Sequence, residues 1–76
     1  MPSSRSTPRV LTPREWQVAV ALTDGCSNGQ IAAMLGISPH TVRNMLSLIY
    51  LKTGSANRVM LASLMLTGKL APPGEQ

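Results

Sequence analysis

The sequence predicts an all-α domain of four helices. Glycines divide residues 11–70 into segments of helical length, and a residue that commonly caps helices stands at or near the start of each segment. The β-branched residues lie within helical patterns and show no alternation typical of strands. The dividing glycines are Gly25, Gly36, Gly54 and Gly68.

The first helix is predicted to begin after Thr12, a capping residue. Pro13 suits the first helical position, and Glu15 completes a capping box with Thr12. We expect this helix to run to about residue 23 or 24 and to stop at the following glycine.

The second and third helices show the same signals. Ser27 and Gln30 form a capping box, and Gly36 ends the short helix that follows them. Ser38 opens a longer helix, which is expected to end near Gly54. The two helices are separated by three residues that include a glycine, which is a helix-turn-helix arrangement. This arrangement can project its second helix into the major groove of DNA.

Composition limits the function classes. The chain has 76 residues, of which 13% are charged and 43% hydrophobic, so it is one small domain whose few charged side chains cannot cover its surface. Some apolar surface is therefore expected to face a partner. The net charge of +4 is compatible with binding to nucleic acid.

Catalytic and metal chemistry find no support. Cys26 and His40 are the single cysteine and histidine, too few for a disulfide or a four-ligand zinc site. The sequence has no nucleophile–base set and no phosphate-binding loop. We expect no enzyme activity, no metal and no cofactor. No apolar run has the length of a membrane span, and we expect a cytoplasmic, nucleoid-associated protein.

Three segments are predicted. Residues 1–10 are expected to form a flexible basic arm that carries Arg5 and Arg9, residues 11–70 the helix-turn-helix domain, and residues 71–76 a disordered tail.

Motifs along this domain resemble the LuxR/GerE type of DNA-binding domain. They are LTPRE at 11–15, GCSN at 25–28, IA at 31–32 and LGISPHTVRN at 35–44, and the resemblance extends over about residues 11–70. It implies a four-helix fold, recognition of DNA by the third helix, and frequent dimerisation through the fourth. It also implies a bacterial transcription regulator, here expected as a stand-alone small regulator without a receiver or ligand domain.

The same resemblance assigns site residues. Arg43 matches a basic position that reaches bases or phosphates, and Asn44 and Ser47 lie on the same face. Thr41 and His40 stand at the helix start, where a phosphate contact is expected, and the remaining predicted contacts to double-stranded DNA are Asn28 and Lys52.

Departures from the family pattern favour an alternative. Gly29 stands where the family commonly has Lys, and Leu48 and Leu51 stand where polar or basic residues are usual. Because phosphate contacts dominate affinity, DNA binding is expected to be weaker than in a typical relative. The alternative is a protein-interaction accessory factor, a co-activator or anti-activator of another regulator or of an RNA polymerase subunit.

Two apolar surfaces are expected to bind proteins. A fourth helix, from about residues 55–57 to Gly68, is apolar almost all round, which predicts a second buried face and a homodimer. Trp16 and Val20 lie four residues apart on the first helix and are expected to form a second partner surface. The predicted dimer contacts are Met60, Leu61, Leu64 and Met65.

Overall fold

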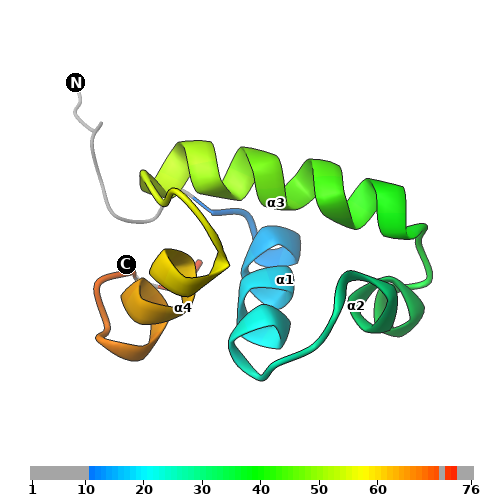
Figure 1. Ribbon diagram of the computed structural model, residues 1–76, viewed down its shortest axis with the longest axis horizontal. Coiled ribbons are helices and arrows are strands. Elements are labelled where there is room, and N and C mark those ends of the chain that lie inside the picture. The colour runs from blue at the N-terminus through cyan, green and yellow to red at the C-terminus, as the bar shows by residue number, and fades with distance from the viewer. Residues whose placement is uncertain (1–10, 71, 74–76) are drawn as a thin grey trace.

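The computed structural model describes residues 11–70 and 72–73, and within them the chain forms four helices (Figure 1). No strand occurs among these described residues, so the all-α prediction is confirmed. The predicted arm and residues 71 and 74–76 of the predicted tail lie outside them. The helices are α1 (Pro13–Thr23), α2 (Asn28–Leu35), α3 (Pro39–Thr53) and α4 (Arg58–Leu66).

Side-chain caps fix where the helices begin. At the start of α1, the Thr12 N–H donates to Glu15 Oε1 at 2.9 Å and the Glu15 N–H donates to Thr12 Oγ1 at 3.1 Å. Ser27 and Gln30 form the same reciprocal pair before α2. Both predicted capping boxes are confirmed. The last helix, α4, begins at Arg58, one residue after its predicted start range of 55–57, because the side chain of Asn57 caps it by accepting from the Met60 N–H at 3.0 Å.

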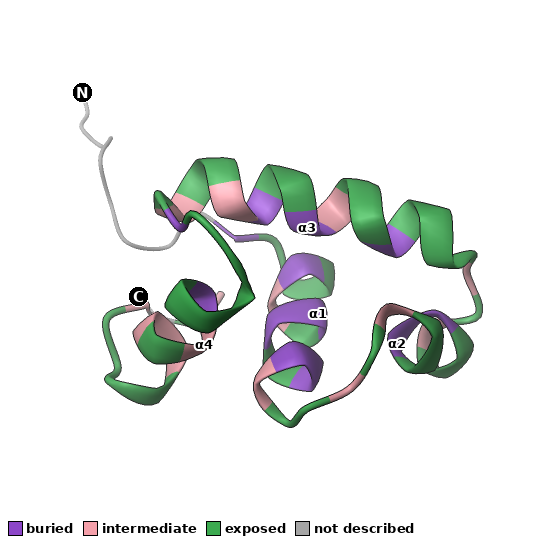
Figure 2. Cartoon of the chain, in the orientation of Figure 1, coloured by how far each residue is buried: buried purple, intermediate pink, exposed green. Residues whose placement is uncertain are grey.

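The helix α1 lies at the centre of the fold. It packs against α2, α3 and α4, while α2 also packs against α3 (Figure 1). The long helix α3 crosses one end of α1, and α2 and α4 lie on opposite sides of it. Buried side chains of all four helices meet around α1, as the purple segments in Figure 2 show. The core consists of Leu11, Val18, Ala19, Ala21, Leu22, Ile31, Ala32, Val42, Leu46, Ile49 and Leu61.

The predicted role of Leu61 needs a correction. Leu61 was expected at a dimer interface, but its side chain is completely buried in the chain's own core. Met65 is half-buried and packs against the same core. The outer face of α4 is instead formed by three exposed apolar side chains. Met60 was one of the predicted dimer contacts, whereas Val59 and Leu66 were not.

An ion pair joins the first turn of α1 to the last turn of α3. Lys52 Nζ donates to Glu15 Oε1 at 2.8 Å and to Oε2 at 3.1 Å. The Glu15 side chain is 8% exposed and that of Lys52 is 29% exposed. Burial raises the pKa of Glu15, but hydrogen bonds from Lys52 and Thr12 and the Lys52 charge together outweigh burial and hold that pKa below its usual value.

Replacing Glu15 by Gln tests this pair, because Gln keeps an acceptor for the capping box and removes the charge. We expect the free energy of unfolding at pH 7 to fall by about 1–3 kcal/mol, since Lys52 then lacks its carboxylate partner. The contribution of a carboxylate with a lowered pKa is complete above its unfolded pKa and is lost as the pH falls through the folded one. Acidification from pH 7 to 3 should therefore destabilise the wild type more than the variant.

Urea denaturation followed by circular dichroism over this pH range measures both effects. Asp24→Asn is the matched control, because it removes one exposed acidic charge outside the pair. An unchanged unfolding free energy for Glu15→Gln, with the same pH dependence as the wild type, would contradict this role of the ion pair.

Candidate nucleic-acid interface

A tight turn sets the angle between α2 and α3. The helix α2 ends at Gly36, whose φ of +71° lies in the left-handed region that a glycine adopts at little cost. The Ile37 N–H returns to the Ala32 carbonyl at 3.0 Å, and the Ser38 side chain accepts from the Thr41 N–H at 3.1 Å to start α3. The helix-turn-helix arrangement is therefore present, and α3 is its second helix.

The two sides of α3 differ in burial. Val42, Leu46 and Ile49 are buried toward α1 and α2, so the opposite side of α3 faces solvent along its whole length (Figure 2). This outer side carries five of the predicted DNA-binding residues together. All five are exposed: His40, Thr41, Arg43, Asn44 and Ser47.

The hydroxyl of Thr41 lies 3.0 Å from the hydroxyl of Ser38, its helix cap. Either hydroxyl can be the donor in this contact. A hydroxyl oxygen also has acceptor capacity, and its hydrogen rotates to suit its partner. Thr41 is thus positioned at the exposed start of α3, where helix N–H groups face outward.

Asn28 is held by a residue that the sequence interpretation did not select. Arg58, the first residue of α4, donates from Nη1 to Asn28 Oδ1 at 3.2 Å and from Nη2 to the Cys26 carbonyl at 2.9 Å. These bonds tie the start of α4 to the start of α2. They occupy the oxygen of the Asn28 amide and leave its NH₂ group to serve as the donor. No local signal reveals this contact, because 30 residues separate the two side chains.

Lys52 differs from the other predicted contacts. It was expected to bind DNA, but its ammonium group is paired with Glu15 at 2.8 Å. The neighbouring carboxylate neutralises its charge and directs the side chain toward α1. Lys52 therefore contributes to the contact between α3 and α1, and its contact with DNA stays a prediction.

Gly29 lies in the first turn of α2, where the family pattern commonly has a cation. A Cβ atom at this position would meet only Ser27 Oγ, at 3.9 Å, which is ordinary van der Waals contact. A Cβ atom can therefore be added at this exposed position without displacing other atoms.

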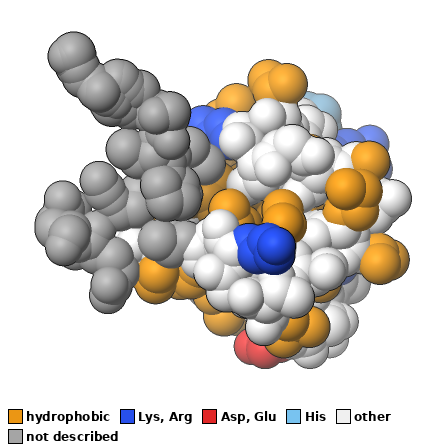
Figure 3. Space-filling view, turned by 90° about the vertical axis from the view of Figure 1, so that its left-hand side faces the viewer, with side chains coloured by type: hydrophobic (Ala, Val, Ile, Leu, Met, Phe, Trp, Pro, Cys, Tyr) orange, Lys and Arg blue, Asp and Glu red, His pale blue; other side chains and the backbone are white. Residues whose placement is uncertain are grey.

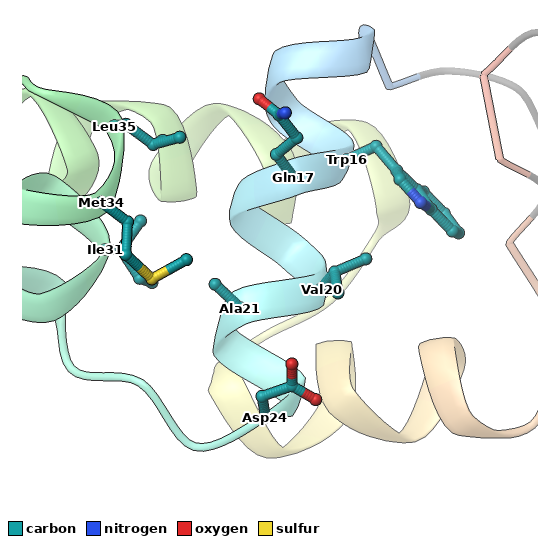
Figure 4. A pocket seen from close by; sticks show the side chains of 8 residues that line it. All are labelled: Trp16, Gln17, Val20, Ala21, Asp24, Ile31, Met34 and Leu35. Carbon is teal, nitrogen blue, oxygen red and sulfur yellow. The ribbon is translucent and has the colours of Figure 1, made fainter.

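Trp16 and Val20 border a groove between α1 and α2. The groove has a volume of about 410 Å³. Figure 4 shows that Trp16 and Val20 come from α1, whereas Met34 and Leu35 come from α2. Met34 is exposed and was not selected from the sequence, because an apolar residue in an amphipathic helix usually points inward. The other lining residues are Gln17, Ala21, Asp24 and Ile31.

Metal and membrane sites do not appear in the described part of the chain. There, no three His, Cys, Asp or Glu residues are grouped so that they could hold a metal ion. None of the helices described is both long and apolar enough to cross a membrane.

Comparison with known proteins agrees with this geometry. Residues 9–65 match the family described as bacterial regulatory proteins, luxR family. The chain is 46% identical over 54 residues to "Probable transcriptional regulatory protein SgaR" of Hyphomicrobium methylovorum, covering 71% of this chain and 26% of that protein. It is 42% identical over 48 residues to the HTH-type transcriptional regulator MalT of Serratia proteamaculans, covering 63% of this chain and 5% of that protein.

The matched region is thus a small part of each of these relatives. No solved structure matches the chain. The family match extends from before α1 into α4 and includes the whole helix-turn-helix. This chain therefore belongs to the luxR family of bacterial regulatory proteins.

Proposed function

We propose that the chain regulates transcription by binding double-stranded DNA and that it reads the major groove with α3. The observation that carries the proposal is the exposed outer side of α3, on which Arg43, Asn44 and Ser47 stand together beyond a tight turn. Arg and Asn side chains form the common bidentate contacts to guanine and adenine in this groove. A helix N-terminus beside a phosphate adds a favourable dipole, and α3 begins with His40 and Thr41 exposed in its first turn.

The supply of cations on this surface is small. Arg43 is the basic residue on the outer side of α3, whereas Lys52 is paired with Glu15 and Arg58 binds Asn28 and Cys26. Each cation that neutralises a phosphate contributes to affinity and to its salt dependence. We therefore propose modest affinity that depends on a second source of binding energy.

A homodimer would supply that second source. The outer face of α4 exposes Val59, Met60 and Leu66, and the side of the molecule where α4 lies in Figure 1 has hydrophobic side chains spread over it in Figure 3. Two copies packed through this face would cover these side chains and present two α3 helices to successive half-sites about one DNA turn apart.

The groove between α1 and α2 favours the alternative function. An apolar groove on a small domain suits a protein partner, and Trp16 and Met34 border it. In this alternative the chain acts as an accessory factor of another regulator or of an RNA polymerase subunit. A stoichiometric protein complex that survives Arg43→Ala would favour the alternative over direct DNA binding.

Fluorescence anisotropy with duplexes selected from a random library tests DNA binding. Arg43→Ala should weaken binding by about 1–3 kcal/mol and relax the preference at one base pair, because a bidentate contact is lost. Lys69→Ala, which removes one exposed charge beyond α4, is the control. An equal loss on all sequences would make Arg43 a phosphate contact, and no loss would contradict the proposed docking of α3.

Gly29→Lys tests whether the start of α2 faces phosphate. The new cation should raise the affinity and increase the slope of log affinity against log salt by about 1, since one more phosphate is neutralised. Gly29→Gln provides the control, because Gln has a similar helix propensity without the charge. If Lys and Gln variants bind DNA equally well at low salt, α2 does not approach the backbone.

Leu66→Lys tests the proposed dimer. Leu66 is exposed at the end of α4, so Lys should leave the isolated domain's stability within about 0.5 kcal/mol of the wild type. It should raise the dimer dissociation constant by at least tenfold, because a charge would be buried in the interface. Sedimentation equilibrium measures this constant, with Met34→Lys as the control. A wild type that remains monomeric at tens of micromolar would refute dimerisation through α4.

A further inference from the structure

The exposed side of α3 changes character along its length. His40, Asn44, Ser47 and Leu51 follow one another at spacings of four, three and four residues, which places them in one stripe along the helix. The first three are polar. Leu51 continues the stripe with an apolar side chain that is 80% exposed.

Leu51 does not serve the core of its own domain. The core lies on the opposite side of α3, at Val42, Leu46 and Ile49. The neighbouring Tyr50 is half-buried and packs against that core, whereas Leu51 points away from it. An apolar side chain this exposed gains free energy when a partner removes it from water.

If α3 lies in the major groove as proposed, this stripe faces the edges of base pairs. Base-pair edges in the major groove present hydrogen-bond donors and acceptors, and the apolar group among them is the C5-methyl of thymine. Leu51 lies about 6 Å beyond Ser47 along the helix axis, one helical turn further along the same stripe. If α3 follows the major groove with Asn44 and Ser47 against base edges, Leu51 faces the same groove one turn further along the helix.

We infer that Leu51 reads a thymine by apolar contact with its 5-methyl group, so that an A·T pair is preferred at that point of each half-site. This inference rests on the proposed function, because it requires α3 to lie in the major groove. The family usually has a polar or basic residue at position 51. The inference explains what Leu at this position could do, which is to select a DNA sequence. The phosphate contact that is lost is exchanged for discrimination between bases.

Uracil substitution provides the test, because deoxyuridine differs from thymidine only in that methyl group. Duplexes are selected from a random library with the full chain, and each thymine is then replaced in turn by uracil. We expect one position per half-site at which the substitution lowers the wild-type affinity about fourfold, as removal of one buried methyl predicts. In the Leu51→Ala variant, uracil and thymine should bind equally well at that position.

Leu48→Ala is the matched control. Leu48 is on the same helix and 44% exposed, but it lies beside the stripe, one residue after Ser47. This variant should keep the full penalty for uracil. Circular dichroism of both variants checks that the helices are retained.

The outcomes distinguish a failure of this inference from a failure of the proposed function. Saturable, salt-sensitive DNA binding that no uracil substitution changes would overturn the inference and leave the proposed function standing. A uracil penalty that persists in Leu51→Ala but disappears in Leu48→Ala would also overturn it. Absence of binding to any duplex would overturn the proposed function and this inference with it.

Discussion

Packing on α1 is the constraint on which the rest of this fold depends. The other three helices all contact α1, and its residues Val18 and Ala19 are completely buried. A domain this small has only one core. The buried apolar side chains of each helix therefore determine which side of that helix faces α1 and the neighbouring helices. Because α3 buries Val42, Leu46 and Ile49 in this way, the direction of its outer side follows directly.

Polar contacts then fix the helix ends relative to one another. Lys52 joins the end of α3 to the start of α1, and Arg58 joins the start of α4 to the start of α2. Both contacts use cations of a chain that has few. Both contacts strengthen the scaffold. The Lys52–Glu15 pair also offsets one positive charge, whereas Arg58 stays exposed and keeps its charge, because its partners are neutral. On the outer side of α3, the proposed interface depends on Arg43, on the helix N-terminus and on neutral side chains.

Local signals predicted most of the fold. The helix boundaries were predictable because their signals involve residues no more than four positions apart. These signals are the capping boxes at Thr12 and Ser27 and the left-handed glycine at Gly36. The face of α3 was also predictable, because its buried residues recur with helical spacing. The motif resemblance then indicated that the third helix would carry the DNA-binding residues. The match of residues 9–65 to the luxR family confirms the predicted family.

Contacts between distant residues were not predictable in the same way. The partner of Glu15 lies 37 residues away, so Lys52 looked like an available cation. The buried face of α4 could not be predicted from the spacing of its apolar residues, because apolar residues occur around almost the whole helix. Leu61 therefore could not be told from Val59 or Leu66, and only packing against α1 shows which of them is buried.

The central claim is that DNA meets the outer side of α3. Amide chemical-shift changes in a ¹⁵N-labelled sample titrated with a selected duplex would test it at every residue at once. The account predicts that the largest changes occur at residues 40–51 and around Asn28, with smaller changes in α1. Largest changes along the α1–α2 groove or on α4, with α3 unaffected, would contradict it.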